Sequence, residues 1–229
     1  MGLEYAAPLG AALHLRTNVE FNVSYGGHDK CHSVECWRAV GKRMRACARG
    51  IEAEAGGEPM PWLVASDEHA LVDALREEVE EAADTADGRH AWRAVALPSE
   101  SRTHSGLSRP IKQLRLEAAQ GTAFHRAAAD SLGPLTEMML IASAQLLVGT
   151  AGSSFSEQAV AFGGMRVATE QEARGEPGAA TPRLAVLFQT PYILGIKGAA
   201  SGGHRGVPLP ESAREANLLC ARVKAAAVG

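Results

Sequence analysis

The sequence has no long apolar run. A membrane-spanning helix needs about 20 consecutive apolar residues, and every hydrophobic stretch in this sequence is much shorter. We therefore expect no membrane span. The first residues, MGLEYAAPLGAALHLR, also lack the basic start and long apolar region of a secretory leader. Basic residues are not in excess either, because 23 Lys and Arg stand against 26 Asp and Glu, for a formal net charge of -3. A nucleic-acid partner is therefore disfavoured.

Cysteine is scarce, and four residues are too few for a disulfide scaffold. Two of the four, Cys31 and Cys36, lie close together in the segment HDKCHSVEC. With His28 and His32 they have the residue types of a four-ligand zinc site, although this spacing matches none of the common structural zinc patterns. The alternatives are a local disulfide in an oxidising compartment and two free thiols in a reducing one. The sequence leaves these alternatives open.

Two common nucleotide-binding fingerprints are absent. No G-x-G-x-x-G follows the first expected strand, and G-x-x-x-x-G-K-[S/T] occurs nowhere in the 229 residues. Ordinary dinucleotide binding and P-loop hydrolysis are therefore disfavoured. The composition is that of a globular protein, with 46% hydrophobic and 21% charged residues, and the chain is long enough to bury a large core.

Short apolar segments alternate with helical segments along the chain. This order predicts a single α/β domain over residues 1–229, with a parallel sheet of about five or six strands, helices on both faces and ligands at the carboxyl edge of the strands. We expect its core within residues 11–190, followed by a loop and a C-terminal helix over 191–229. Two stretches rich in glycine and proline, 175–182 and 195–210, are expected to be loops. The expected strands are Ala11–Arg16, Met60–Ala65, Ala91–Leu97, Leu146–Val148, Met165–Ala168 and Leu184–Phe188.

Helices are expected to alternate with these strands. The helix over Phe124–Ser143 should be broken at Gly133-Pro134, because proline removes a backbone donor and clashes with the preceding turn. In the C-terminal helix, Glu211–Ala226, the expected core contacts are Leu218, Leu219, Ala221 and Val223. The five expected helices begin at Ser33, Ser66, Phe124, Phe155 and Glu211.

The most informative stretch is AQLLVGTAGSSFSEQAVAFGG, Ala144–Gly164, which predicts a strand, a tight turn and a helix. The turn over Thr150–Ser154 has small side chains, so its backbone N–H groups are accessible and hydroxyls stand beside them. The positive end of the following helix points into the same space. Such a turn binds an anion, most often a phosphate. The alternative is that these small residues only cap the helix.

Polar groups follow three of the expected strands where the strands end, at His14–Thr17, Ala65–Glu68 and Gly149–Ser154. Because the carboxyl ends of parallel strands meet at one edge of a sheet, we expect a basic fork, an acid and an anion-binding turn to face one cleft. An arginine grips a diphosphate with two parallel hydrogen bonds, and a carboxylate accepts from a ribose hydroxyl or a base N–H. The three strand ends therefore outline a nucleotide site.

The segments HLRT (His14–Thr17), WLVASDE (Trp62–Glu68) and MLIASAQLLVGTAGSSFSEQAVAFGG (Met139–Gly164) occur in this order, each with an expected strand. Together they resemble the three donor-domain motifs of GDP-fucose-dependent fucosyltransferases, the group of α1,6-, nodulation-type and protein O-fucosyltransferases. The resemblance implies a GT-B fold whose C-terminal, Rossmann-like half binds GDP-fucose without a metal or other cofactor. This chain would be that half, acting in transfer of fucose to a glycan or protein hydroxyl. It would work in the Golgi or another secretory compartment.

The resemblance also implies roles for individual residues. Arg16 would hold the β-phosphate and help GDP to leave, the step in which negative charge develops. His14 would contact the nucleotide, and Asp67 matches the acid after the second strand. Glu137 stands thirteen positions before Thr150, where the α1,6 group has an aspartate that reads guanine. Hydroxyl and backbone contacts to phosphate would come from Thr150, Ser153, Ser154 and Phe155.

The chain departs from the family in two respects. Eight positions after the arginine of the first motif the α1,6 group has a glutamate, whereas this chain has Ser24. Glu20 is therefore the candidate base that activates the acceptor hydroxyl. The first motif also begins close to Met1, so we expect the acceptor-binding N-terminal half to be absent and turnover by this chain alone to be inefficient.

Other roles for these residues stay open. Arg16 can pair with Glu20 at the surface, His14 can be a core histidine, Asp67 can cap a helix and Glu137 can be an exposed helix residue. Two further function classes stay open as well. One is a non-catalytic nucleotide-binding or partner-binding domain that kept the fold and lost the chemistry. The other is a transferase that uses another nucleoside-diphosphate sugar.

Overall fold

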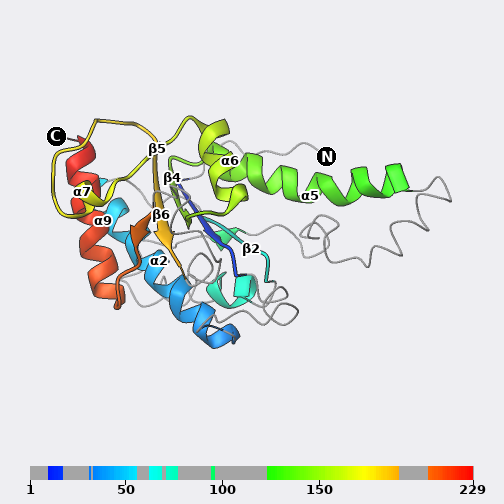
Figure 1. The fold of residues 1–229 in the computed structure, drawn as a ribbon, viewed down its shortest axis with the longest axis horizontal. Helices are drawn as coiled ribbons and strands as arrows, with labels where there is room; N and C mark the ends of the chain where they lie inside the picture. The colour runs from blue at the N-terminus through cyan, green and yellow to red at the C-terminus, as the bar shows by residue number, and fades with distance from the viewer. Residues whose placement is uncertain are drawn as a thin grey trace.

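A parallel β-sheet forms the centre of the protein (Figure 1). The structure is a computed structural model that describes residues 10–17, 31, 33–55, 62–68, 71–76, 94–95, 123–190 and 206–228. Within them the strands are β1 (Ala11–Leu15), β2 (Trp62–Ser66), β3 (Ala94–Val95), β4 (Leu146–Thr150), β5 (Arg166–Val167), β6 (Leu184–Gln189) and β7 (Val207–Pro208). They form one sheet of seven strands in the order β3-β2-β1-β4-β6-β5, with β7 also paired to β6. Every pairing is parallel, which confirms the predicted α/β, Rossmann-like fold class.

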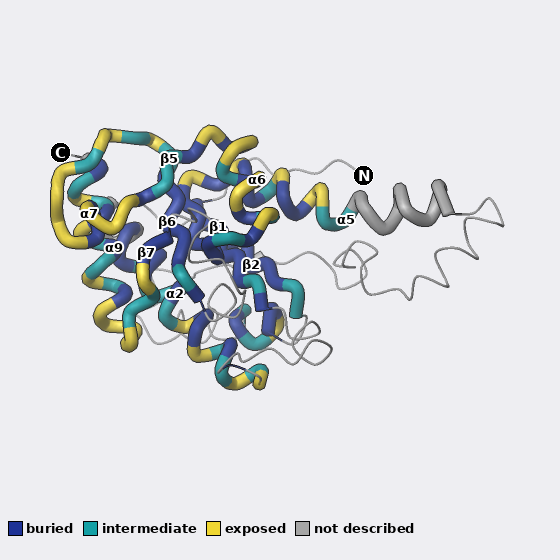
Figure 2. The backbone as a smooth tube through the Cα atoms, in the orientation of Figure 1, coloured by how far each residue is buried: buried dark blue, intermediate teal, exposed yellow. Residues whose placement is uncertain are grey.

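Helices cover both faces of this sheet. They are α2 (Val34–Ala55), α5 (Ala123–Ser143), α6 (Ser154–Gly163), α7 (Glu170–Ala173), α9 (Ala213–Val228) and a short helical segment over 71–76. α2 and α9 pack together on one face, and α5 and α6 pack together on the other (Figure 1). Figure 2 shows the central strands as the buried middle layer, with exposed residues on the outer sides of the helices. Because both faces are covered, the central strands are apolar along most of their length.

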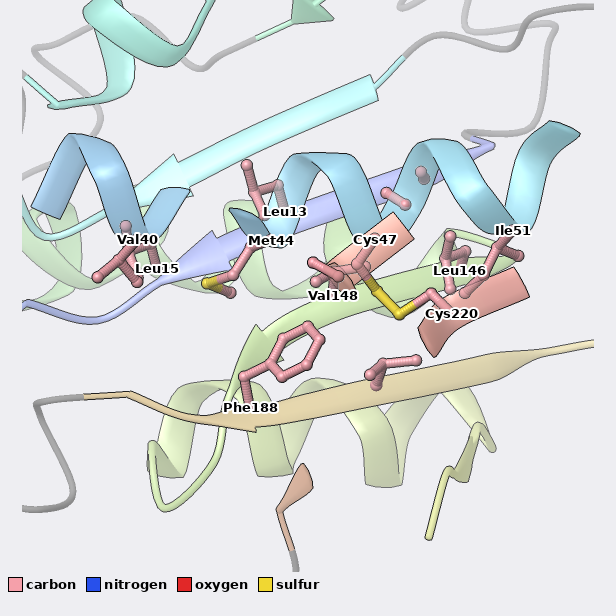
Figure 3. Close-up of a cluster of buried hydrophobic side chains, with 14 of the residues drawn as sticks. Leu13, Leu15, Val40, Met44, Cys47, Ile51, Leu146, Val148, Phe188 and Cys220 are labelled. Atoms are coloured by element: carbon pink, nitrogen blue, oxygen red, sulfur yellow. A yellow bond between two sulfur atoms is a disulfide. The ribbon is translucent and has the colours of Figure 1, made fainter. Parts of the chain in front are cut away.

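Two apolar cores result, one on each side of the sheet. On the α2 side, alternate strand residues such as Leu13, Val148 and Phe188 meet residues of the helices (Figure 3). The helix expected from Ser33 is confirmed, and its apolar residues, three or four positions apart, are buried in this core: Trp37, Val40, Met44, Cys47, Ala48 and Ile51. The smaller core on the other side joins the strands to α5 and α6.

The predicted break in the long helix before β4 is wrong. α5 continues through Gly133-Pro134, with Pro134 inside it. Proline removes one backbone hydrogen bond, but the turns that follow bury Met138, Ile141 and Ala142 in the core shared with α6. Tertiary packing therefore outweighs the local penalty at Pro134.

Several other expectations need correction. In α9, Val223 is buried and Leu219 packs against the core, as expected, but Leu218 is 51% exposed. The other buried positions are Ala216, Cys220 and Ala227. The apolar face of this helix consists of small residues, which allow α2 to lie close. β7 lies in a stretch expected to be a loop, where Val207 adds a short pairing to the end of β6. Among the helices in the described residues, none has the length and apolarity needed to cross a membrane.

All four cysteines are in disulfides, Cys31–Cys36 and Cys47–Cys220. The first pair is the local disulfide that was one of the three alternatives for Cys31 and Cys36. Because disulfide-bonded cysteines cannot bind zinc as thiolates, the zinc site is excluded for this state. His28 and His32 lie outside the described residues. The second pair joins α2 to α9 inside the core (Figure 3). A pairing across 173 residues of sequence is visible only once the two helices are known to be neighbours.

Arg183, just before β6, holds the ends of α5 and α6 together. Its guanidinium donates to the carbonyl oxygens of Ala142, Ala144 and Gly163. These carbonyls lie at or beside the C-terminal ends of the two helices, where the helix dipole favours a positive charge. The position of α6 against the sheet is therefore fixed from its C-terminal end.

Replacing Cys47 and Cys220 together by alanine should lower the free energy of unfolding by about 4 kcal/mol, because a long-range cross-link strongly restricts the unfolded chain. The matched control replaces Cys31 and Cys36, which are only 5 residues apart, and it should lose clearly less. Denaturant unfolding of the oxidised proteins measures both losses. Equal losses would contradict the importance of the α2–α9 cross-link.

Candidate functional site

The carboxyl ends of β1 and β4 lie side by side at the centre of the sheet. The chain leaves β1 toward β2 on one side, and β4 begins the other half of the sheet. Such a change of direction is a topological switch point, where open α/β sheets bind their ligands. The three predicted strand ends meet at this edge, because Leu15 pairs with Ser66 and His14 pairs with Gly149. The predicted juxtaposition is therefore confirmed.

At the end of β1, side chains of the two neighbouring strands form hydrogen bonds with the backbone of Leu15 and Arg16. From β2, the Ser66 hydroxyl donates to the backbone carbonyl of Leu15 at 2.7 Å. From β4, the Thr150 hydroxyl oxygen accepts the backbone N–H of Arg16 at 3.1 Å. Thr150 is fully buried, and its hydroxyl is committed to β1. This end of β1 is consequently fixed in direction as it leaves the sheet.

Asp67, just after β2, binds the next two residues of the same segment. Its Oδ1 accepts from the backbone N–H of Thr17 at 2.7 Å and from the Thr17 hydroxyl at 3.1 Å. Its Oδ2 lies 3.5 Å from Nη1 of Arg16, with 23% of the Arg16 side chain exposed. Asp67 is thus more than a helix cap, since its partners lie 50 residues earlier in the chain. Arg16 therefore presents a cation at this edge of the sheet.

The turn after β4 leads directly into α6. Gly152 has φ of 72°, a left-handed conformation that favours glycine. Ser153 occupies the N-cap position and is 2% exposed, yet its side chain makes no cap hydrogen bond. The side-chain bond expected of a capping serine is therefore absent at Ser153. Its hydroxyl lies at the positive end of α6, beside the exposed Ser154.

His14 and Phe155 join α6 to β1. Nδ1 of His14 lies 2.7 Å from Oγ of Ser156, and its ring stacks on Phe155 with ring centroids 4.8 Å apart. His14 is only 4% exposed. Gly149 makes room for this contact, because a Cβ there would lie 3.0 Å from Oγ of Ser156. These contacts fit the alternative of a satisfied core histidine, whose function is to hold α6.

Ser156 was not among the residues predicted for the site. Its signal in the sequence is a polar residue on the otherwise small and apolar inner side of α6, with Ala159 and Gly163. Its partner His14 is 142 residues away in sequence, so the bond itself has no local signature.

Of the two glutamates predicted for the site, Glu137 belongs to the described residues. Glu137 lies on α5 next to Met138 and is 8% exposed, so it is not an exposed helix residue. The structure buries it in the helical layer rather than at the end of a strand. Glu20 lies outside the described residues, as does Ser24. The role of Glu20 as a base stays a prediction.

Buried polar side chains gather at this edge of the sheet. Nine of the described residues are buried and polar or charged, and only Glu137 and Glu172 belong to other places. Thr190, at the end of β6, was not predicted, and within the described residues its Oγ1 has no hydrogen-bond partner. The described residues contain no group of three or more His, Cys, Asp or Glu side chains that could hold a metal ion. The seven polar residues of the edge are His14, Thr17, Ser66, Thr150, Ser153, Ser156 and Thr190.

No protein-family model matches the chain, and no curated protein matches it either.

Replacing Ser156 by alanine should lower the free energy of unfolding by about 1–2 kcal/mol, because Nδ1 of His14 would stay buried without its partner. The matched control is Ser154→Ala in the same helix, which is exposed and should change stability by less than about 0.5 kcal/mol. Thermal or denaturant unfolding measures the difference. Equal effects of the two substitutions would show that the His14–Ser156 bond does not hold α6.

Proposed function

We propose that this chain binds the diphosphate of a nucleotide sugar at the carboxyl ends of β1 and β4, as the donor-binding half of a fucosyltransferase-like GT-B glycosyltransferase. The observation that carries the proposal is the juxtaposition of Arg16 with the turn that starts α6, on neighbouring strands at the switch point. A cation on one strand and a helix N-terminus on the next form two sides of an anion site. The family that the three motifs resemble uses GDP-fucose.

The chemistry of the site suits the departure of a nucleoside diphosphate. When the bond between sugar and phosphate breaks, negative charge grows on the β-phosphate, and a fixed cation stabilises that charge. Arg16 is partly exposed and held by its backbone and side chain, so it is suited to this part. The backbone N–H groups at the start of α6 and the Ser153 hydroxyl are suited to the remaining phosphate oxygens. In this proposal no metal is needed.

The remaining roles follow the resemblance only in part. The resemblance gives the guanine base to Glu137, but Glu137 is buried in the helical layer away from this edge of the sheet, so the proposal does not include that contact. Phe155 and His14 depart from the resemblance, because in this proposal they support the phosphate-binding turn through their stacking and the bond of His14 to Ser156. Glu20 would take the proton of the acceptor hydroxyl, and the acceptor itself would be a glycan or a protein side chain.

The disulfides support a secretory compartment such as the Golgi. Disulfides form and persist mainly in oxidising compartments. Here all four cysteines are paired, and Cys47–Cys220 lies within the core. This agrees with the compartment that the resemblance implies.

A titration of the full chain with GDP, UDP and GDP-fucose tests the proposal. Selective binding of GDP and GDP-fucose over UDP is the expected result. Labelled GDP-fucose, supplied with a panel of glycan and peptide acceptors, then separates transfer from slow hydrolysis. Binding without transfer would favour a non-catalytic domain, preference for UDP would favour another sugar donor, and binding of none of the three would exclude the proposal.

Arg16→Lys should weaken GDP binding by about 1.5–3 kcal/mol, because lysine keeps the charge and loses the two-pronged contact. GMP lacks the β-phosphate and should be affected little. Isothermal titration calorimetry measures both affinities. Arg174→Lys is the matched control, since Arg174 is exposed and pairs with Glu170 on α7. Equal losses for GDP and GMP would mean that Arg16 does not hold the β-phosphate.

A further inference from the structure

The carboxylate of Asp67 is occupied on both oxygens by donors of the protein itself. Oδ1 receives the amide and the hydroxyl of Thr17 at 2.7 and 3.1 Å, and the Ser66 hydroxyl lies 3.4 Å from the same atom. Oδ2 faces Arg16 Nη1 at 3.5 Å, and the Asp67 side chain is only 8% exposed. A carboxylate offers about four lone-pair positions in all. A ribose hydroxyl or base N–H at Oδ1 would have to displace donors that hold the end of β1, and at Oδ2 it would compete with the Arg16 guanidinium.

We propose that Asp67 is a positioning residue, which holds the Arg16 guanidinium and the end of β1 for a diphosphate and does not contact the nucleotide. The proposal rests on the proposed function and deepens it. It also departs from the expectation that an acid after the second strand accepts from a ribose or a base.

Two physical arguments favour a positioning role. An arginine that is held before the ligand arrives loses less conformational freedom on binding, so more of the contact energy appears as affinity. A free carboxylate next to a phosphate site would also repel the ligand. The ion pair with Arg16 and the two hydrogen bonds from Thr17 counter that repulsion. The same three contacts therefore orient the Arg16 guanidinium and reduce the repulsion between the Asp67 carboxylate and a bound phosphate.

Asp67→Asn in the full chain tests the proposal, because asparagine keeps an oxygen for Thr17 and loses the charge that faces Arg16. GDP should bind roughly tenfold more weakly, and GMP and guanosine should change less than about twofold. In a cycle with Arg16→Ala, adding Asp67→Asn should cost no further GDP affinity, because the two residues act as one unit. Equal losses for GDP, GMP and guanosine that add to the effect of Arg16→Ala would overturn the proposal and favour direct contact.

Thr17→Val is the matched control. It removes one hydrogen bond to Oδ1 and leaves the Oδ2 contact with Arg16, so it should affect GDP and GMP by the same factor. Thermal unfolding of each variant shows whether it is folded. A variant that does not fold is replaced by Asp67→Glu, which keeps the charge and should retain the preference of the wild type for GDP over GMP.

A second readout needs no ligand. In the chain labelled with ¹⁵N-arginine, the Nε–H signal of Arg16 should be sharp in the wild type and in Thr17→Val, and should broaden or exchange faster in Asp67→Asn. Identical Arg16 signals in the wild type and Asp67→Asn would overturn the positioning role. If the wild type binds no GDP while the signal still depends on Asp67, the proposed function fails and the contact that positions Arg16 stands.

Discussion

The direction of the chain where β1 ends is the constraint on which the proposed site depends. Ordinary sheet pairing ends at Leu15, and side chains from both neighbouring strands then bind the backbone of the next residues. Thr150 holds the N–H of Arg16 from one side, and Asp67 holds that of Thr17 from the other. Because these bonds fix the backbone on both sides of the Arg16 side chain, they determine where its charge lies.

The helix that completes the site is held at both of its ends. At the N-terminal end, His14 and Phe155 stack and Ser156 bonds to His14, which ties α6 to the same strand that carries Arg16. At the C-terminal end, Arg183 binds the carbonyl of Gly163 together with carbonyls at the end of α5. A cation and a helix N-terminus with a fixed separation are pre-organised for an anion, which reduces the cost of reorganisation when charge develops.

The sequence predicted the central strands and the edge at which they end, because buried parallel strands are apolar runs followed by polar residues. It did not predict what the polar residues bind. Asp67 has the residue type of a ligand-binding acid or a cap, and only the pairing of β1 with β2 shows that Thr17 is its partner. The same holds for Cys47 and Cys220, whose pairing depends on the contact between α2 and α9. The sequence also predicted a break at Pro134, but α5 continues through it, because the packing of the following turns outweighs the local cost of proline.

Mapping GDP binding onto the chain by NMR tests the central claim most directly. Backbone amide signals of the ¹⁵N-labelled protein are followed during a titration with GDP. The proposed site predicts saturable shifts at Arg16, at Thr17 and over residues 150–156, with little change in α9 on the other face of the sheet. The absence of saturable shifts at these residues, or shifts confined to another part of the chain, would contradict a nucleotide site at the ends of β1 and β4.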